Sequence, residues 1–240
     1  MSLLVVDQVI KRFRGLTAVD GASFQVGAGE IFAVIGPNGA GKTTLFNLIA
    51  GVFAPDAGAI SFEGTRIDGL APDAICRLGI GRTFQLVRPF PALTVEDNAL
   101  IGALLRRPGV EAARAHAHDV LRRLDLYDKR HQLASALTLP DRKRLEVARA
   151  LATDPKLLLL DEVMAGLRPA ETDRMVAILR TLNRESGITI LLIEHVMRAV
   201  MALAARVLVL HHGAAIAEGT PETVVRDQAV IDSYLGAEAL

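Results

Sequence analysis

Short runs of uninterrupted apolar residues alternate along the chain with stretches in which apolar residues recur at helical spacing. The apolar runs occupy residues 31–35, 156–160, 188–193 and 207–210. Runs of this kind are typical of parallel strands that are covered on both faces. The helical pattern covers residues 43–50, 142–152, 169–185 and 196–204. This alternation predicts an α/β fold with a mainly parallel sheet.

Two regions depart from this alternation. Residues 1–30 and 58–67 have the pattern of antiparallel strands joined by glycine-containing turns. Residues 94–128 are almost entirely helical in pattern, and Thr94 followed by Asp97 resembles a capping box at the start of a helix. We interpret these regions as an antiparallel β subdomain and a helical subdomain, both added to the α/β core.

The length fits one domain, which we expect to span residues 1–240. Within it, the patterns predict a core made of residues 1–85 and 153–240 and an inserted helical subdomain of residues 86–152. A chain of this length buries a sizeable core without disulfide bonds. Its single cysteine, Cys76, cannot form an internal disulfide, which favours a cytoplasmic protein.

Hydrophobic residues make up 51% of the chain, although aromatic residues contribute only 4%. An apolar content this high raises the question of a membrane span. The longest apolar window, residues 196–217, is interrupted by Arg198, Arg206 and Gly213, and the N-terminal residues lack the order of a signal peptide. We therefore predict no spanning helix and place the apolar excess in buried strands or in an interface.

The charges of the chain balance, with 27 basic and 27 acidic residues. Binding to nucleic acid through the phosphate backbone needs surplus positive charge, so no nucleic-acid partner is expected. For the same reason, attachment to a membrane is expected through a protein partner and not through lipid electrostatics.

A glycine-rich segment stands between the predicted strand at residues 31–35 and the helix that follows it. It reads Gly36-Pro37-Asn38-Gly39-Ala40-Gly41-Lys42-Thr43, which fits the phosphate-loop pattern G-x-x-x-x-G-K-[ST]. Glycines let backbone N–H groups converge on phosphate oxygens, and the helix N-terminus adds favourable partial charge. We expect Lys42 to reach the β- and γ-phosphates, the Thr43 hydroxyl to bind Mg²⁺, and Thr44 to complete the nucleotide site.

A second motif is an apolar strand that ends in two carboxylates, Leu157-Leu158-Leu159-Leu160-Asp161-Glu162. In parallel sheets, ligands lie beyond the carboxyl ends of the strands, and adjacent side chains point in different directions. We expect Asp161 to bind Mg²⁺ and Glu162 to orient or deprotonate the attacking water. The alternative is a solvated acidic end of a strand, but a phosphate loop in the same chain favours the functional interpretation.

With these motifs, the chain from Val5 to Leu235 resembles the ATP-binding-cassette (ABC) ATPases, and most of all the ATP-binding subunits of branched-chain amino acid importers. The matching segments are residues 11–20 (KRFRGLTAVD), 79–85 (GIGRTFQ), 145–151 (LEVARAL), 190–195 (ILLIEH), 217–222 (AEGTPE) and 234–236 (YLG). The motifs also follow one another in the family's order. The resemblance implies the ABC ATPase fold, a member of the P-loop NTPase class.

The same resemblance implies roles for three further residues. Phe13 would stack on the adenine ring, and His195 would sense the γ-phosphate. Gln85 would contact Mg²⁺ or the catalytic water, and the loop after it would face a permease. The implied cofactors are ATP and Mg²⁺.

The segment at the position of the family's signature departs from the family pattern. Where the family usually has a serine followed by glycines, this chain has Thr138, Leu139, Pro140 and Asp141. We expect Thr138 to cap the next helix and Asp141 to repel a γ-phosphate bound by a partner. In this family the signature of one subunit completes the ATP site of the other. We therefore hypothesise pairing with a non-identical cassette and two unequal sites.

These features predict the ATPase subunit of an ABC importer on the inner face of the cell membrane, powering uptake of branched-chain amino acids or a related small solute. The expected partners are a second ATPase subunit, integral membrane permease subunits and, indirectly, an extracytoplasmic solute-binding protein. The permease is expected to contact residues 86–128, including Val87, Phe90 and Leu93. The alternatives are an exporter ATPase for lipid or polysaccharide, a soluble non-transport ABC ATPase, and a catalytically silent nucleotide-binding subunit.

Overall fold

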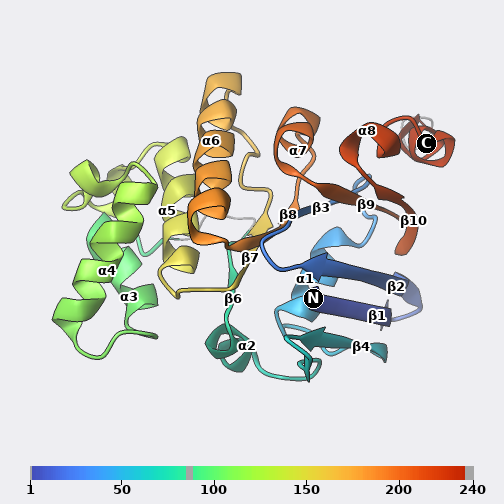
Figure 1. Ribbon diagram of the computed structural model, residues 1–240, viewed down its shortest axis with the longest axis horizontal. Coiled ribbons are helices and arrows are strands. Elements are labelled where there is room, and N and C mark those ends of the chain that lie inside the picture. Colours follow the sequence, from blue (N-terminus) through green and yellow to red (C-terminus); the bar gives the residue numbers. More distant parts are fainter. Residues whose placement is uncertain (1, 85–88, 236–240) are drawn as a thin grey trace.

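A six-stranded sheet forms the centre of the protein in the computed structural model, which describes residues 2–84 and 89–235 (Figure 1). The order of its strands is β10-β9-β3-β8-β7-β6. Their bounds are β3 (Ile31–Ile35), β6 (Ile80–Arg82), β7 (Leu157–Asp161), β8 (Thr189–Ile193), β9 (Arg206–His211) and β10 (Ala214–Gly219). Neighbouring strands are parallel except for β9 and β10, which are antiparallel. The predicted fold class is confirmed.

A second, antiparallel sheet has the order β2-β1-β4-β5. Its strands are β1 (Ser2–Phe13), β2 (Leu16–Gly27), β4 (Ala57–Phe62) and β5 (Thr65–Arg66). It covers one face of the parallel sheet, because apolar side chains of both sheets and of helix α1 (Lys42–Ile49) form one buried cluster. The predicted antiparallel β subdomain is therefore present.

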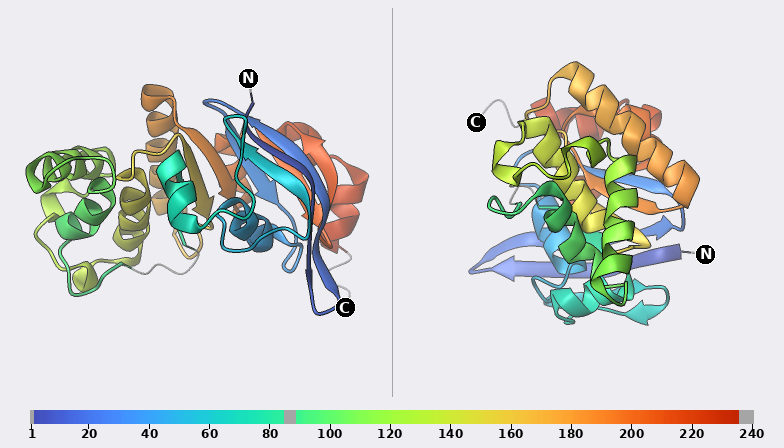
Figure 2. Two further views of the ribbon diagram at one scale, coloured as in Figure 1. Left: turned by 90° about the horizontal axis from the view of Figure 1, so that it is seen from below. Right: turned by 90° about the vertical axis from the view of Figure 1, so that its left-hand side faces the viewer.

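Helix α2 (Pro72–Leu78) lies on the same side as α1 and the antiparallel sheet, and the remaining helices cover the other face of the parallel sheet or extend from one end of it (Figures 1 and 2). These remaining helices are α3 (Val95–Ala103), α4 (Val110–Arg123), α5 (Leu139–Leu151), α6 (Pro169–Ser186), α7 (Met197–Leu203), α8 (Pro221–Val224) and α9 (Gln228–Leu235), with 3-10 turns at Tyr127–Lys129 and Ala134–Ala136. Helices α3, α4 and α5 stand together at one end. Within residues 2–84 and 89–235, no helix is both long and apolar enough to cross a bilayer.

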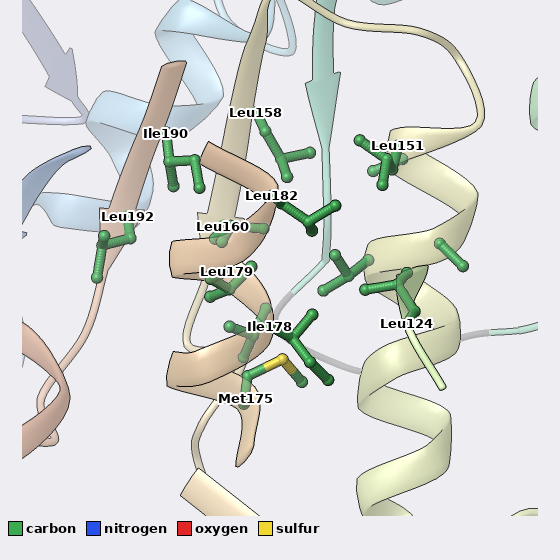
Figure 3. Close-up of a cluster of buried hydrophobic side chains, with 14 of the residues drawn as sticks. Leu124, Leu151, Leu158, Leu160, Met175, Ile178, Leu179, Leu182, Ile190 and Leu192 are labelled. Atoms are coloured by element: carbon green, nitrogen blue, oxygen red, sulfur yellow. The ribbon is translucent and has the colours of Figure 1, made fainter. Parts of the chain in front are cut away.

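The side chains of the central strands alternate between two buried clusters. Leu158 and Leu160 of β7 lie beside Leu179 and Leu182 of α6 on one face of the sheet (Figure 3). Leu157 and Leu159 belong to the cluster on the other face, which includes residues of α1. This is why the strands are apolar at every position. The first cluster continues through α5 into α3 and α4, so the helical region and the core share one hydrophobic cluster. The division into a core of residues 1–85 and 153–240 and a helical subdomain of residues 86–152 stays a prediction.

Two helix starts show how local chemistry sets the boundaries. Helix α5 begins at Leu139, three residues before the predicted start, because a proline such as Pro140 is tolerated in the first turn. Helix α3 begins after Thr94, whose Oγ1 accepts the Asp97 N–H at 3.0 Å, as predicted. The other half of the expected capping box differs, since the Thr94 hydroxyl donates to the Asp97 carboxylate.

We predict that Leu179→Ala lowers the free energy of unfolding by roughly 2–5 kcal/mol, because the side chain is fully buried and its removal leaves a cavity. Val110→Ala, at a residue that is 52% exposed, serves as the control and should change it by less than about 0.5 kcal/mol. Urea unfolding followed by circular dichroism measures both. Equal effects of the two substitutions would contradict the packing of α6 against the sheet.

Candidate nucleotide-binding site

The carboxyl ends of four neighbouring parallel strands meet at one edge of the large sheet. These strands are β3, β8, β7 and β6, and the register pairs Val34 and Asp161 with the same residue of β8, Ile193. The segments that leave these ends therefore begin side by side. The sequence motifs occupy these segments, as expected for ligand sites of parallel sheets.

The glycine-rich loop between β3 and α1 is held tightly by its neighbours. At Gly36 the φ angle is 149°, and an added Cβ would lie 2.1 Å from the carbonyl oxygen of Leu210. At Gly41 φ is 98°, and a Cβ would lie 2.1 Å from the carbonyl oxygen of Ala18. Only glycine combines these backbone angles with such close approach. The loop is thus clamped between the end of β9 and the hairpin of β1 and β2.

The same hairpin holds Phe13, the predicted adenine-stacking residue. Its side chain is 37% exposed, and its ring meets the Phe53 ring edge-on at a centroid distance of 5.2 Å. Because this hairpin also supplies Ala18 to the phosphate loop, Phe13 and the loop belong to one packed unit. A partly exposed ring on the hairpin that contacts the loop fits the predicted stacking role, which stays a prediction.

The phosphate loop turns some of its residues toward solvent and buries others. Asn38, Gly39 and Thr43 are exposed, Pro37 and Thr44 are half-buried, and Ala40 is buried. The exposed positions are those at which a phosphate chain could approach the backbone and the Thr43 hydroxyl.

Lys42 is buried at the start of α1, and its Nζ donates to the carbonyl oxygens of Gly36 at 2.8 Å and Pro37 at 2.9 Å. Burial lowers the pKa of Lys42, while the charges of Glu162 and Asp161 act in the opposite direction. The lysine and the two carboxylates are therefore close enough to interact. This arrangement brings together the two motifs that the sequence predicted separately.

Asp161 ends β7 and is almost fully buried. Its Oδ2 lies 3.4 Å from a terminal nitrogen of Arg82, and its backbone N–H donates to the Thr83 hydroxyl at 3.0 Å. Burial raises the pKa of Asp161, although Arg82 opposes the increase. Its Oδ1 has no hydrogen-bond partner among the described residues.

A buried carboxylate oxygen without a partner among the described residues, close to the predicted phosphate loop, fits a magnesium site. Mg²⁺ is usually held by one or two carboxylates together with substrate phosphates. In residues 2–84 and 89–235, the histidine, cysteine and carboxylate side chains form no group of three that could hold a metal. Asp161 and Thr43 would therefore bind Mg²⁺ together with the nucleotide and not within a cage of protein ligands.

Glu162 and His195 lie close together beyond β7 and β8. The Glu162 backbone has a φ of 49° and donates its N–H to the carbonyl oxygen of Ile193 at 3.0 Å. Its Oε1 is 3.9 Å from Nδ1 of His195, whose side chain is 57% exposed. A carboxylate and an imidazole at this distance can share the tasks of orienting a water and accepting its proton. Gln85, predicted to join them, lies outside the described residues.

Sequence reasoning missed two buried ionisable residues behind this pair. Glu194 is 1% exposed, and its Oε1 accepts the Met164 N–H at 2.9 Å, while burial raises the pKa of this carboxyl. Lys143 of α5 is also buried, and its Nζ donates to the carbonyl oxygen of Glu162 at 2.8 Å. The acidic end of an apolar strand could have indicated Glu194. Only the fold distinguishes Lys143 from the neighbouring Arg142, which is exposed.

The comparison with known protein families shows to which family the chain belongs. A model described as ABC transporter matches residues 19–165, more than half of the chain. The chain belongs to the ABC transporter family. A second model, described as branched-chain amino acid ATP-binding cassette transporter, matches residues 216–239. The resemblance inferred from the motifs is confirmed, and the chain is an ABC ATPase.

Individual relatives of this ABC ATPase match it from end to end. LivG of Salmonella typhimurium, a high-affinity branched-chain amino acid transport ATP-binding protein, is 39% identical over 98% of both chains. LptB of Escherichia coli K12, a lipopolysaccharide export system ATP-binding protein, is 34% identical over 99% of both. A solved ATP-binding cassette of an ABC transporter in its ADP conformation is 32% identical, with a TM-score of 0.89 over 98% of this chain and 99% of that one.

The signature-equivalent segment of this cassette differs from the expectation in two ways. Thr138 stands at the N-cap of α5 but makes no capping hydrogen bond; its Oγ1 donates to the Asp141 carboxylate at 2.9 Å instead. The predicted cap is therefore wrong. Asp141 is 2% exposed and also accepts hydrogen bonds from Lys129 and Arg144. Its charge is compensated inside the fold, so the expected bare repulsive charge is absent at this residue.

The other two residues of the segment have a different place. Leu139 is 42% exposed and lies against Gly166 in the loop that follows Glu162, while Pro140 occupies the first turn of α5. The segment thus presents an apolar side chain at the position where the family usually has glycine.

We predict that Gly41→Ala abolishes ADP binding and destabilises the fold by more than about 2 kcal/mol, because strain and a collision with Ala18 add together. Gly64→Ala is the matched control, since Gly64 has a φ of 76° and nothing within 4 Å of an added Cβ. It should cost only about 1–2 kcal/mol and leave ADP binding intact. Urea unfolding and titration calorimetry measure both effects.

We predict that Asp141→Asn lowers the free energy of unfolding by roughly 3 kcal/mol at neutral pH, because it leaves the buried Arg144 guanidinium undercompensated. Asp119→Asn breaks an exposed pair with Arg122 at the same spacing and should cost less than about 1 kcal/mol. Urea unfolding compares the two variants.

The effect of Asp141→Asn should also depend on pH. Burial alone would raise the pKa of Asp141, but hydrogen bonds from Lys129 and Thr138 and the charge of Arg144 outweigh it, so the pKa is lowered. The carboxylate therefore stabilises the fold above its unfolded pKa of about 3.9, and this stabilisation is lost as the pH falls through the folded value. If the difference in the free energy of unfolding between Asp141→Asn and the parent stayed unchanged below pH 3, the role of the Asp141 charge would be contradicted.

Proposed function

We propose that this ABC ATPase powers a membrane importer for branched-chain amino acids or a related small solute. The observation that carries the proposal is the 39% identity to LivG over 98% of both chains. The match of residues 216–239 to a model of branched-chain amino acid cassettes supports it from a separate part of the chain. The solute itself would be chosen by a permease and an extracytoplasmic binding protein.

The proposed chemistry is hydrolysis of ATP to ADP and phosphate at the carboxyl edge of the large sheet. The phosphate loop, residues 36–44, would bind the phosphates through its backbone N–H groups, with Lys42 at the β- and γ-phosphates. Phe13 would stack on the adenine ring. Thr43 and Asp161, with Gln85, would hold Mg²⁺, which when bound would neutralise charge on the phosphates.

The remaining residues of the site would act on the attacking water. Glu162 would accept a proton from the water as its oxygen attacks the γ-phosphorus, and ADP would leave from the opposite side. His195 would contact the γ-phosphate from its exposed position near Glu162. The Lys143 hydrogen bond to the Glu162 carbonyl oxygen supports this assignment, because it ties the proposed general base to α5.

An apolar groove of about 380 Å³ is the surface we assign to the permease. It lies where α2, β6, α3 and α5 meet, and its apolar lining includes Val52, Ile75, Ile80, Ile101 and Leu105. Several of these side chains are well exposed, and exposed apolar surface of this kind marks protein contacts. Binding there would hold the chain peripherally on the inner face of the membrane.

The predicted permease contacts lie partly beside this groove. Phe90 is 45% exposed, and the guanidinium of Arg149, which lines the groove, lies 4.9 Å from its ring centroid. The Leu93 N–H donates to the carbonyl oxygen of Phe90 at 3.1 Å, so the two residues belong to one turn. Val87 lies outside the described residues. We keep Phe90 and Leu93 as proposed contacts.

We further propose that the chain works as a dimer with a second, non-identical cassette. The signature-equivalent segment would be offered to the ATP site of that partner, and Leu139 and Pro140 replace the glycines whose backbone usually approaches a phosphate. Because the charge of Asp141 is compensated inside the fold, repulsion by this residue would not weaken the ATP site of the partner. The loss of the glycine backbone would weaken that site instead. Rapid, cooperative hydrolysis by the isolated chain as a homodimer would contradict this.

An exporter ATPase is the second candidate, because LptB is 34% identical over 99% of both chains. The higher identity to LivG and the match of residues 216–239 favour the importer. Co-purification with the membrane subunits, followed by ATPase assays in liposomes, distinguishes the two. Stimulation by branched-chain amino acids and their binding protein is expected; stimulation by a lipopolysaccharide alone would support the exporter.

In the same assay, we predict that Glu162→Gln lowers turnover by roughly 10²–10⁴-fold, because the amide cannot accept the proton of water. Binding of ATP should remain, so the variant should retain nucleotide that the parent hydrolyses. Glu222→Gln, in α8, is the control and should hydrolyse ATP like the parent. A loss of less than tenfold in Glu162→Gln would move the general-base role to another residue.

A further inference from the structure

Arg82 joins two parts of the site that the sequence motifs leave separate. It is the last residue of β6, and its side chain is 12% exposed. One terminal nitrogen donates to Oδ1 of Asn47 at 2.7 Å, and the other lies 3.4 Å from Oδ2 of Asp161. Asn47 belongs to α1, the helix that begins with Lys42 and Thr43. The guanidinium thus bridges the helix of the phosphate loop and the proposed magnesium-binding carboxylate.

The bridge contacts only one of the two oxygens of the Asp161 carboxylate. Arg82 contacts only Oδ2, whereas Oδ1 is buried and has no hydrogen-bond partner among the described residues. A guanidinium is a rigid fork that can bind two acceptors at once, which a lysine ammonium on a flexible stem does not reproduce. Groups that orient a metal-binding side chain commonly change metal affinity by 10–100-fold when they are removed.

Arg82 is also part of the wall of the apolar groove. It lines the groove together with Phe84, and its guanidinium carbon lies 5.6 Å from the centroid of that ring. Its Nε is buried and lacks a hydrogen-bond partner in the part of the chain that the structure describes. A buried donor of this kind favours a nearby acceptor. A segment that enters the groove would contact the Arg82 side chain, which already contacts Asp161.

We propose that Arg82 is a positioning residue that orients Asp161 for Mg²⁺ and links the affinity for Mg²⁺ to occupation of the apolar groove. This rests on the proposed function only in taking Asp161 as a magnesium ligand. The linkage is reciprocal. An occupant of the groove that shifts Arg82 changes the affinity for Mg²⁺ with nucleotide, and bound Mg²⁺ with nucleotide changes the affinity of the groove for its occupant by the same factor.

The first experiment measures binding of ADP to the isolated full chain by titration calorimetry, with Mg²⁺ and with a chelator. The variants are Arg82→Met and Arg82→Lys, and Arg106→Met is the matched control. Arg106 follows α3 and donates to the carbonyl oxygens of Thr153 and Cys76, which line the groove, and to none of the site residues. Thermal unfolding of each variant shows that it is folded.

Arg82→Met should leave the affinity for metal-free ADP within about twofold and reduce the gain in affinity from Mg²⁺ by roughly 10–100-fold. Arg82→Lys should fall between parent and Arg82→Met, because the charge remains but the bridge does not. Arg106→Met should match the parent. An unchanged gain in the folded Arg82 variants, or an equal loss of ADP affinity with and without Mg²⁺, would overturn the positioning role.

The second experiment tests the link to the groove through Cys76, the single cysteine of the chain, which lines it. A bulky maleimide on Cys76 serves as the groove occupant, and the gain from Mg²⁺ is measured again. A change of about fivefold or more is expected in the parent, with little change in Arg82→Met. No change in the parent, or the same change in both, would overturn the link.

The isolated chain suffices for both experiments, so their outcome is separate from that of the proposed transport function. A chain that behaves as expected here but is not stimulated by branched-chain amino acids in liposomes would contradict only the choice of importer and solute. A chain that transports them while Arg82→Met retains the full gain from Mg²⁺ would contradict only the role of Arg82.

Discussion

The parallel arrangement of β3, β8, β7 and β6 imposes one constraint on the whole protein: whatever follows these strands must share a single edge of the sheet. Burial on both faces holds that arrangement, since α6 and α7 cover one face and α1 with the antiparallel sheet covers the other. The phosphate loop, the two carboxylates at the end of β7 and the histidine after β8 are close together for this reason. The chemistry of the site is thus a consequence of strand direction and core packing.

Charged side chains are concentrated at this edge of the sheet, and the fold places lysines close to the carboxylates. Asp161, Glu162 and Glu194 come from strand ends, while Lys42 comes from α1 and Lys143 from α5. Burying isolated charges would be very unfavourable, so each cation is placed where it interacts with a carboxylate or with backbone carbonyl oxygens. Helices α1 and α5 and the ends of β7 and β8 therefore all contribute to the electrostatics of this site.

The same principle explains the altered signature segment. Replacing glycines by Leu139 and Pro140 removes flexible backbone, while Asp141 is drawn inward to Arg144, Lys129 and Thr138. The segment is therefore built as the stable start of α5, and the apolar Leu139 is part of its exposed surface. A partner cassette would meet a shape that differs from the usual glycine turn, but it would not meet an uncompensated carboxylate at Asp141.

By itself, the sequence determined the class of the fold and the chemistry at single positions. Alternating apolar strands and amphipathic helices predicted the parallel sheet, and local spacing identified the phosphate loop and the Asp161-Glu162 pair, because these signals lie within a few consecutive residues. Tertiary structure alone decided which charges meet. The contact of Asp141 with Lys129 and the Arg82 bridge join residues from separate elements, and no local pattern reports the direction of a side chain across such distances in the chain.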